Sequence, residues 1–221
     1  MSGVPFEPWP KIARLNREVI ITEKLDGTNA AVVIIPIADV PHWRDEEGAV
    51  ISLVDPDHSR ALDIVGPHGD ELVVFAQSRT RFITPDADNF GFAAYVKANA
   101  EALADILGPG RHFGEWWGSG IQRGYGLSDG EKRFSLFNVA RWGQADLSAV
   151  AGLGVVPLLN PLIGGSTLDA VDDAIELLRS KGSVAEPGFM RPEGVVVWHT
   201  AARTSFKVLL EGDDIPKGLA A

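Results

Sequence analysis

The residues VIITEKLDGTNAAVVIIPI, numbered 19–37, decide the fold of this chain. Apolar and β-branched side chains fill both ends of this stretch, and such residues favour strands. The polar residues 23–29 interrupt it, and Gly27 suits a tight turn there. The stretch therefore predicts a strand, a turn and a second strand, forming a hydrophobic hairpin that displays polar side chains at its middle.

Lys24 stands within this run of strand formers, although lysine usually prefers solvent. One explanation is a surface lysine paired with a neighbouring carboxylate, Glu23 or Asp26. The other is a nucleophilic amine, which must lose its proton and therefore needs burial or a nearby cation. Apolar strands would supply burial, whereas Glu23 and Asp26 would hold the ammonium charged. The nucleophile hypothesis therefore requires a metal ion or a substrate that changes this balance.

Further strand and helix patterns follow along the chain. Residues 38–70 are richer in Pro, Asp, His and Gly, and we expect a mobile excursion there with one short strand at 50–54. Apolar spacing predicts helices over 89–107 and 168–180, and strands are expected at 71–78, 111–117, 133–140, 194–199 and 204–210. Strand and helix do not alternate regularly, which favours antiparallel sheets. The predicted fold class is α+β, with helices at the flanks of the sheets.

The composition indicates a single folded domain over residues 1–221. Hydrophobic residues make up 45% of the chain and charged residues 23%, and a chain of this length can bury one core. The formal charge of −10 argues against a protein that coats nucleic acid by bulk attraction, so any such contact must be local. Cysteine is absent, and no leader-like or membrane-length apolar run occurs. We therefore expect a cytoplasmic protein that does not enter a membrane.

The segment EKLDGTN, residues 23–29, resembles the Lys-x-Asp-Gly motif of the covalent nucleotidyltransferases, which include DNA ligases, RNA ligases and capping enzymes. Thr28 and Asn29 extend the resemblance towards the ATP-dependent RNA ligase family of the nick-joining phage type. Other motifs of that superfamily follow in order across nearly the entire chain: SR at 78–79, FGEWWG at 113–118, GIQRGY at 120–125, FSLFN at 134–138, EGVVV at 193–197 and SFKV at 205–208. The resemblance implies the nucleotidyltransferase fold, which is ATP-grasp-like.

The resemblance also implies a role for each motif residue in adenylyl transfer from ATP. Lys24 would be the nucleophile that becomes attached to AMP, Lys207 a cation on the α-phosphate, and Arg79 a contact to the ribose or the RNA end. Asp26, Glu115 and Glu193 would complete the catalytic set and organise Mg²⁺ or Mn²⁺ through water. The remaining nucleotide contacts would be Glu115 at a ribose hydroxyl, Glu23 at the base edge, Asn29 at the 5′-phosphate, Phe137 stacked on adenine, and Val195 or Val197 on the other face of adenine.

The implied reaction forms lysyl-AMP, moves AMP to a 5′-phosphate of RNA or RNA/DNA ends, and joins that end to a 3′-hydroxyl.

Two features depart from the family. The last motif usually has two lysines separated by one residue, but here Ser205 takes the place of the first, and Arg203 is a candidate substitute for it. After the fourth motif, Trp198 stands where a basic residue is common. Only fourteen residues follow Lys207, so we expect no further C-terminal domain. The alternatives are a relative that acts on DNA nicks or stops at nucleotide transfer, and a catalytically impaired nucleic-acid-binding relative.

Overall fold

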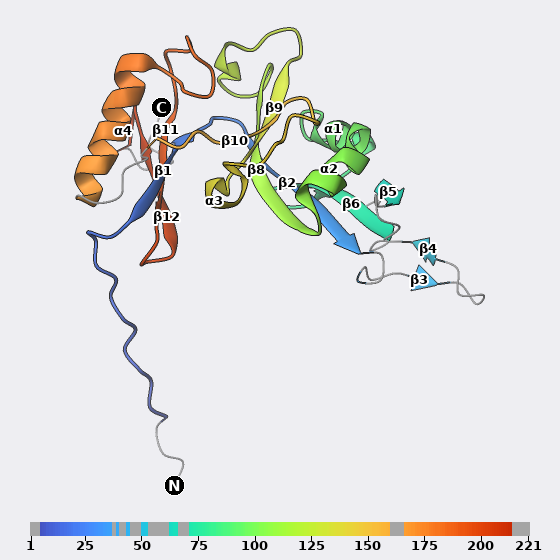
Figure 1. Ribbon diagram of the computed structural model, residues 1–221, viewed down its shortest axis with the longest axis horizontal. Coiled ribbons are helices and arrows are strands. Elements are labelled where there is room, and N and C mark those ends of the chain that lie inside the picture. Colours follow the sequence, from blue (N-terminus) through green and yellow to red (C-terminus); the bar gives the residue numbers. More distant parts are fainter. Residues whose placement is uncertain are drawn as a thin grey trace.

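Two sheets stand side by side, the smaller one packed against one helix and the larger one against two (Figure 1). The computed structural model describes residues 5–36, 39, 43–44, 50–52, 62–65, 71–159 and 166–213. The smaller sheet has the strand order β1–β11–β12, and the larger sheet has the order β10–β9–β8–β2–β6–β5 with β7 paired to β6. Strands β3 and β4 form a separate pair. The arrangement confirms the predicted α+β class with mainly antiparallel sheets.

The elements have the following bounds. The strands are β1 Val19–Lys24, β2 Thr28–Pro36, β3 Trp43–Arg44, β4 Val50–Ser52, β5 Leu62–Val65, β6 Glu71–Ser78, β7 Phe82–Ile83, β8 Gly110–Gly118, β9 Lys132–Leu136, β10 Leu153–Val155, β11 Gly194–His199 and β12 Thr204–Leu209. The α-helices are α1 Phe92–Ala98, α2 Ala100–Leu107, α3 Val139–Trp142 and α4 Thr167–Lys181, and short 3-10 turns are η2 Pro85–Ala87 and η3 Gly124–Gly126. None of the helices in the described ranges is long and apolar enough to cross a bilayer.

The hairpin expected over 19–37 is wrong in its pairing. β1 pairs with β11, from Val19 opposite His199 to Lys24 opposite Gly194, whereas β2 lies between β8 and β6 in the larger sheet. The linker between β1 and β2 runs tightly past β8, because a Cβ on Gly27 would lie 2.4 Å from the backbone oxygen of Trp116. Only glycine fits at that approach. Gly27 therefore carries the chain from one sheet to the other instead of reversing it.

Each sheet has its own apolar core, and a further cluster joins the two. The larger core packs the large sheet against α1 and α2, and the smaller core packs β1 and β11 against α4. The joining cluster buries Leu25 of the linker with Trp117, Tyr125 and Val156. Burial of a leucine side chain stabilises a fold by about 1.5–3 kcal/mol. Leu25 therefore anchors the linker at the junction of the sheets.

Several predicted boundaries also shift. The helix expected over 89–107 is two helices, because the backbone leaves helical geometry at Asn99. The strand expected over 133–140 ends at Leu136, since the side chain of Asn138 accepts a hydrogen bond from the Arg141 backbone nitrogen and starts α3. β10, which pairs in parallel with β9, was not predicted. The excursion expected over 38–70 lies largely outside the described residues, which there include β3, β4 and β5.

A single carboxylate organises the start of α1. The side chain of Asp88 accepts hydrogen bonds from the backbone nitrogens of Asn89, Ala93 and Ala94 at 2.6, 2.8 and 3.0 Å. Such bonds satisfy donors that a helix start leaves without partners, and the negative charge suits the helix dipole.

We predict that Asp88→Ala lowers the free energy of unfolding by about 0.5–2 kcal/mol, the usual cost of losing a helix cap. Urea denaturation would measure it. Asp105→Ala is the matched control, because Asp105 is exposed on α2 and should change the stability little. Equal stabilities of the two variants would contradict the capping role.

Candidate functional site

Lys24 lies at the end of β1, beside the residue that precedes β11. Its Nζ donates to Oε2 of Glu193 at 2.5 Å, and both side chains are partly buried, at 23% and 15% exposure. The register that sets Lys24 opposite Gly194 produces this contact. The carboxylate that pairs with Lys24 is therefore Glu193, and not Glu23 or Asp26 as the sequence indicated.

Glu115 of β8 reaches the same region from the larger sheet. Its Oε1 accepts from the Gly27 backbone nitrogen at 3.2 Å, and its Oε2 accepts from Asn29 Nδ2 at 2.8 Å. Burial raises the pKa of Glu115 to about 7, although the Asn29 hydrogen bond and the charge of Lys24 oppose the rise. The nearby charge of Glu193 adds to it. Lys24 thus sits in the electrostatic reach of carboxylates from both sheets.

Asp26 points to a different partner. Its Oδ2 accepts from Arg123 Nε at 3.0 Å, and Arg123 also donates to the Arg191 carbonyl. Across the described ranges no three His, Asp or Glu side chains gather in a way that could hold a metal ion. Asp26, Glu115 and Glu193 therefore do not form a direct metal cluster, and Asp26 is occupied by a cation of the protein itself.

The phenol of Tyr125 ties the site together. Its hydroxyl donates to the Lys24 carbonyl at 3.1 Å and accepts from the backbone nitrogens of Asp26 and Glu193, each at 3.3 Å. The side chain is fully buried, between Trp117 and Phe189. Burial is the main cause that raises the pKa of this phenol, which keeps it a hydrogen-bonding neutral group. One side chain thus fixes the end of β1, the linker and the start of β11.

Glu23 lies on the opposite face of β1 from Lys24. Its Oε2 accepts from the backbone nitrogens of Val184 and Ala185 at 2.8 and 2.9 Å, while its buried Oε1 has no hydrogen-bond partner among the described residues. Burial raises the pKa of this carboxyl, against the hydrogen bonds that favour its charge. Glu23 is therefore part of the buried contact between β1 and the segment after α4.

The valine expected on the adenine face is misassigned. Directly opposite residues of paired strands share a face of the sheet. Val195 pairs with Glu23 and is buried in the core against α4, and Val197 is buried there too. Val196 instead lies opposite Thr22 and Lys207, on the face that carries Lys24. Strand alternation explains the error, because a shift of one residue turns a side chain to the other face.

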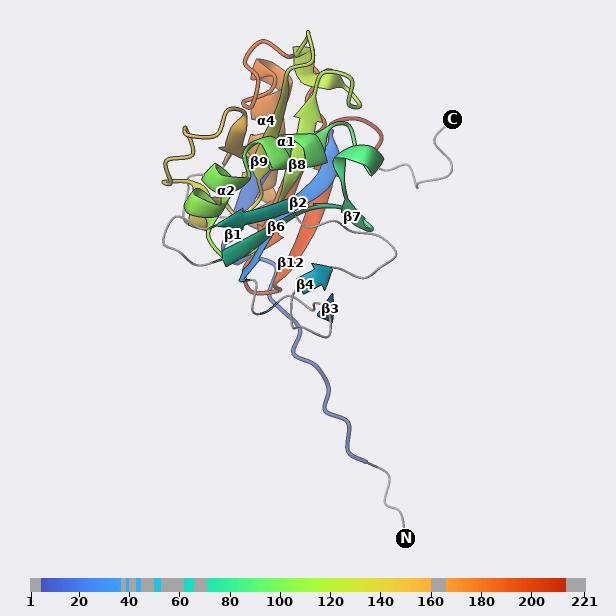
Figure 2. The ribbon, with the colours of Figure 1, turned by 90° about the vertical axis from the view of Figure 1, so that its right-hand side faces the viewer.

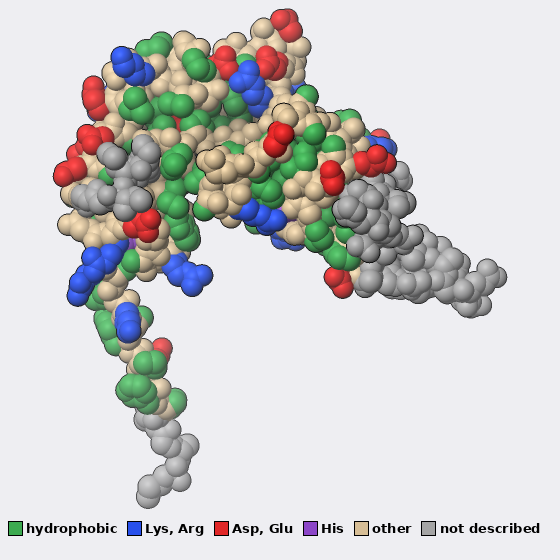
Figure 3. Space-filling model, in the orientation of Figure 1, with side chains coloured by type: hydrophobic (Ala, Val, Ile, Leu, Met, Phe, Trp, Pro, Cys, Tyr) green, Lys and Arg blue, Asp and Glu red, His purple; other side chains and the backbone are tan. Residues whose placement is uncertain are grey.

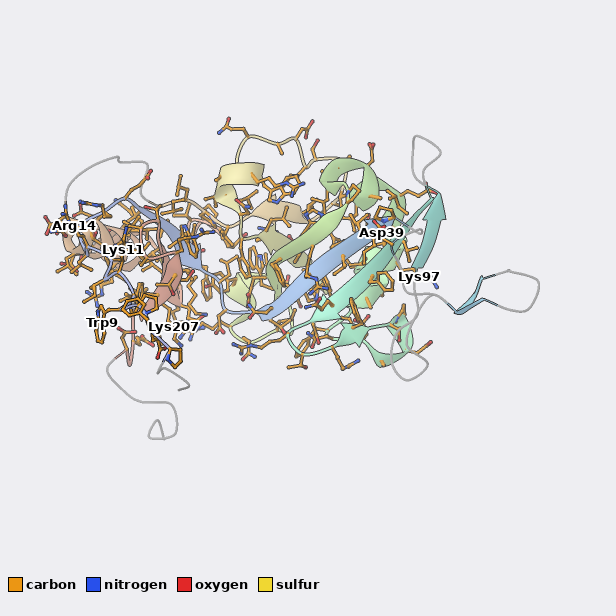
Figure 4. The ribbon with its side chains drawn as sticks, turned by 90° about the horizontal axis from the view of Figure 1, so that it is seen from below. Trp9, Lys11, Arg14, Asp39, Lys97 and Lys207 are labelled. Atoms are coloured by element: carbon orange, nitrogen blue, oxygen red, sulfur yellow. The ribbon has the colours of Figure 1, made fainter. Side chains whose placement is uncertain are left out.

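Lys207 and the two departures from the family pattern share this face. Lys207 is exposed in the middle of β12 opposite Val196, and Trp198 lies opposite Ser205. Trp198 is 38% exposed. Figure 4 shows Lys207 at one end of the molecule, on the side of the smaller sheet. Among the described residues this face therefore presents Lys207 and the Trp198 ring, with Trp198 and Ser205 at positions where the family pattern has basic residues.

The other predicted residues lie on the larger sheet. Asn29 is opposite Glu115 and bonded to it, and Arg79 follows β6 directly, where Ser78 pairs with Ala30. Phe137 comes just after β9, with its backbone nitrogen bonded to the Phe113 carbonyl, and is 41% exposed. Arg79 is exposed in the turn. The strand register thus brings Asn29 and Glu115 together, while Arg79 and Phe137 flank them without a bond to Lys24 among the described contacts.

Sequence reasoning gave no role to Tyr125, Arg123 or Val196. Tyr125 and Arg123 belong to GIQRGY, which the sequence marked only as a family-like segment. A buried tyrosine must bond its hydroxyl, which was the available signal, but its partners are backbone atoms that no pattern of side chains reveals.

Comparison with known proteins adds to this geometry. A family model described as RNA ligase matches residues 17–209, which include every motif residue described above. The chain belongs to the RNA ligase family. No curated protein matches its sequence.

Two solved structures of Naegleria gruberi RNA ligase mutants are similar to this family member. One, with AMP and Mn, is 16% identical with a TM-score of 0.48, and covers 88% of this chain and 50% of that chain. The other, with ATP and Mn, is 15% identical with a TM-score of 0.46, and covers 89% of this chain and 51% of that chain. The chain spans about half the length of both.

We predict that Tyr125→Phe lowers the free energy of unfolding by about 1–3 kcal/mol, because it leaves buried backbone groups of three segments without a partner. The chain offers a matched control in Tyr95, its only other tyrosine, whose buried hydroxyl has no partner among the described residues. Tyr95→Phe should be neutral or slightly stabilising. Equal losses in both variants, measured by urea denaturation, would refute the bridging role of Tyr125.

A pH prediction follows from Glu115. Its pKa of about 7 lies above its ordinary value of 4.5, so the folded protein keeps a proton that the unfolded chain releases between these values. The stabilising contribution is complete below about pH 4.5 and is lost as the pH rises through about 7. We therefore expect the unfolding free energy of the wild type, relative to Glu115→Gln, to fall by up to about 3 kcal/mol between pH 4 and 8. Glu101→Gln on α2 is the exposed control, and a pH-independent difference would contradict the burial argument.

Proposed function

We propose that this member of the RNA ligase family is an ATP-dependent polynucleotide ligase that works through AMP bound covalently to Lys24. The observation that carries the proposal is the position of the Lys24 amine, 2.5 Å from Glu193 and in the electrostatic reach of Glu115 on the other sheet. The ion pair holds the amine in a defined position at the end of β1, and Glu193 is a carboxylate that could accept its proton once a bound nucleotide changes the charge balance.

The first step would form a phosphoramidate. The Lys24 nitrogen attacks the α-phosphorus of ATP, the bond from that phosphorus to the bridging oxygen breaks, and pyrophosphate leaves with the electron pair. The Lys24 ammonium would first give one proton to Glu193, which already accepts a hydrogen bond from it, and the second proton would leave to water as the nitrogen–phosphorus bond forms. Lys207, on the same face of the smaller sheet, would offset the charge of the α-phosphate.

Two further steps would complete the reaction. An oxygen of the RNA 5′-phosphate attacks the AMP phosphorus, the nitrogen–phosphorus bond breaks, and the nitrogen takes up two protons, one from Glu193 and one from water. The 3′-hydroxyl of the second end then loses its proton to water and attacks the 5′-phosphorus, and AMP leaves as the new phosphodiester forms. Arg79 and Asn29, at the edge of the larger sheet, would contact the RNA end.

The nucleotide would bind between the two sheets. Phe137 offers a partly exposed ring on the larger sheet and Val196 an aliphatic side chain on the smaller one, which replaces Val195 in the expected pair. Glu23, the residue expected at the base edge, lies with Val195 on the other face of the smaller sheet and would not take part in this pocket. Glu115 would accept from a ribose hydroxyl.

A divalent cation, Mg²⁺ or Mn²⁺, would neutralise phosphate charge when it arrives with ATP. The described residues gather no direct three-ligand site, so we route no step through a metal held by the protein. Contacts of Glu115 and Glu193 to such an ion would run through water. With Ser205 in place of a second lysine, the protein supplies fewer cations of its own to the phosphates than the family pattern does.

We predict that the protein incubated with α-labelled ATP and Mg²⁺ or Mn²⁺ retains label after denaturation, and that Lys24→Ala reduces this label to background. Lys97→Ala is the matched control, since Lys97 is exposed on α1 at the opposite end of the molecule from Lys207 (Figure 4). The proposal would be overturned if the wild type took no covalent label with any nucleotide or metal. Label that persists in Lys24→Ala would overturn it as well.

The labelled protein then tests the substrate. Purified free of ATP, it should pass AMP to a 5′-phosphorylated RNA and release a sealed strand when a 3′-hydroxyl is supplied. Transfer only to a nicked DNA would favour the DNA-acting alternative. A strand that carries AMP on its 5′-phosphate but is never sealed would favour an enzyme that stops at nucleotide transfer.

A further inference from the structure

The first described residues form an extended arm, residues 5–17, that runs clear of the body. Figures 1 and 2 show it leaving the smaller sheet and pointing away in both views. Its side chains are almost fully exposed: Phe6 90%, Trp9 85% and Ile12 84%. Large apolar side chains in water are unfavourable and mark a binding surface when they gather. The site described above makes no use of this arm.

The arm has a period of three. Phe6, Trp9, Ile12 and Leu15 follow one another at intervals of three residues, and so do Lys11, Arg14 and Arg17. The prolines at 5, 8 and 10 favour the polyproline II conformation, which has three residues per turn. In that conformation one edge of the arm is apolar and a second edge is basic. The space-filling view shows hydrophobic side chains along the arm and basic side chains near its root (Figure 3).

The root of the arm is fixed at a defined end of the smaller sheet. The Leu15 carbonyl accepts from His199 Nε2 and from Thr167 Oγ1, each at 2.8 Å. Val19 follows, opposite His199, which itself lies opposite Thr204. The arm therefore leaves the sheet at the end remote from Lys24, and β1 separates the two points by roughly 17 Å.

Side chains on the Lys24 face lead from the amine to the end of the sheet where the arm leaves, and the arm itself is anchored on the other face by His199 and Thr167. Two residues back from Lys24 along β1, the row of side chains on this face across β1, β11 and β12 is Thr22, Val196 and Lys207. The next row, two residues further back, is Ile20, Trp198 and Ser205. Lys207 is exposed, and the Trp198 ring is 38% exposed. Figure 4 shows Trp9, Lys11, Arg14 and Lys207 at the same end of the molecule. A cation and then an aromatic ring thus lie between the amine and the end of the sheet from which the arm leaves.

Charge selects the kind of partner. The arm has three cations, Lys11, Arg14 and Arg17, and one acid, Glu7, which gives it a net charge of 3 − 1 = +2 in a chain of −10. Aromatic side chains spaced among cations bind single-stranded nucleic acid, because bases stack on the rings and phosphates meet the cations. The acidic surface of a second copy would match the basic edge of the arm but not its apolar edge. A single strand matches both edges, because its phosphates meet the cations and its bases meet the apolar side chains.

We propose that the N-terminal arm, with Trp198 and Lys207 as its continuation, binds the single strand that leads away from the nucleic-acid end held at Lys24. This inference deepens the proposed function and rests on it for the identity of that end. The stiff prolines lower the ordering cost of the arm on binding. The arm would compensate for the acidic charge of the body and for the cations that Trp198 and Ser205 replace.

The test uses the full chain and a fluorescent, 5′-phosphorylated single-stranded RNA, with binding followed by anisotropy in the absence of ATP. Trp9→Ala should weaken binding roughly 10-fold, the loss of one stacked base. Lys11→Ala with Arg14→Ala should lower the slope of log affinity against log salt by about 1.4, for two lost phosphate contacts. The control is Lys97→Ala with Arg179→Ala, which removes the same charge from exposed sites on α1 and α4 and should leave the slope unchanged.

Labelling by ATP separates this inference from the proposed function. Each arm variant should take AMP label from α-labelled ATP to within about twofold of the wild type, because its substitutions lie outside the site. RNA affinity and salt slope equal to those of the control variant would overturn the inference. So would a Trp9→Ala variant that binds RNA normally but loses self-association by light scattering, since the arm would then serve a second copy. Absence of AMP label in the wild type would instead refute the proposed function.

Discussion

The passage of the chain from the smaller sheet to the larger one at residues 25–27 is the constraint on which the site depends. Three interactions fix it: Leu25 is buried in the joining cluster, Gly27 passes the Trp116 carbonyl where no Cβ fits, and Glu115 and Tyr125 bond the linker backbone. Lys24 is the last residue before this passage, so its amine contacts Glu193 beside β11 while its charge influences Glu115 of the larger sheet. A linker free to move would lose that alignment.

Charge around Lys24 explains why the site would stay inactive without its nucleotide. Glu193 holds the ammonium in an ion pair, and Glu115 is buried nearby with a pKa close to neutral. ATP would bring phosphates that compete for Lys24 and need cations of their own. The Lys24 face supplies Lys207, while Trp198 and Ser205 stand at the other positions. Cations must therefore arrive with the substrates or come from outside the site, and the arm has three of them.

Sequence patterns located most elements but not their partners. β6 and β11 have the predicted bounds. Among the predicted site residues, Lys24 contacts Glu193 and Asn29 contacts Glu115, and their roles stay predictions. The sequence did not reveal that β1 and β2 pair with other strands and not with each other. Two apolar strands on either side of a glycine have the same sequence pattern in both cases. Val195 was chosen over Val196 because a run of three valines hides which alternate faces the site. The Tyr125 bridge uses backbone groups, which leave no trace in a sequence.

The central claim is that the amine of Lys24, held between the two sheets, is the atom that takes AMP. Peptide mapping by mass spectrometry tests it most directly, with the protein treated with ATP and a divalent cation and digested at mildly alkaline pH to preserve a phosphoramidate. The account predicts one AMP per chain, on the peptide that contains Lys24 and at that residue. An adduct on Lys207, on Lys11 or on any other residue, or an unmodified Lys24 peptide in protein that seals RNA, would contradict it.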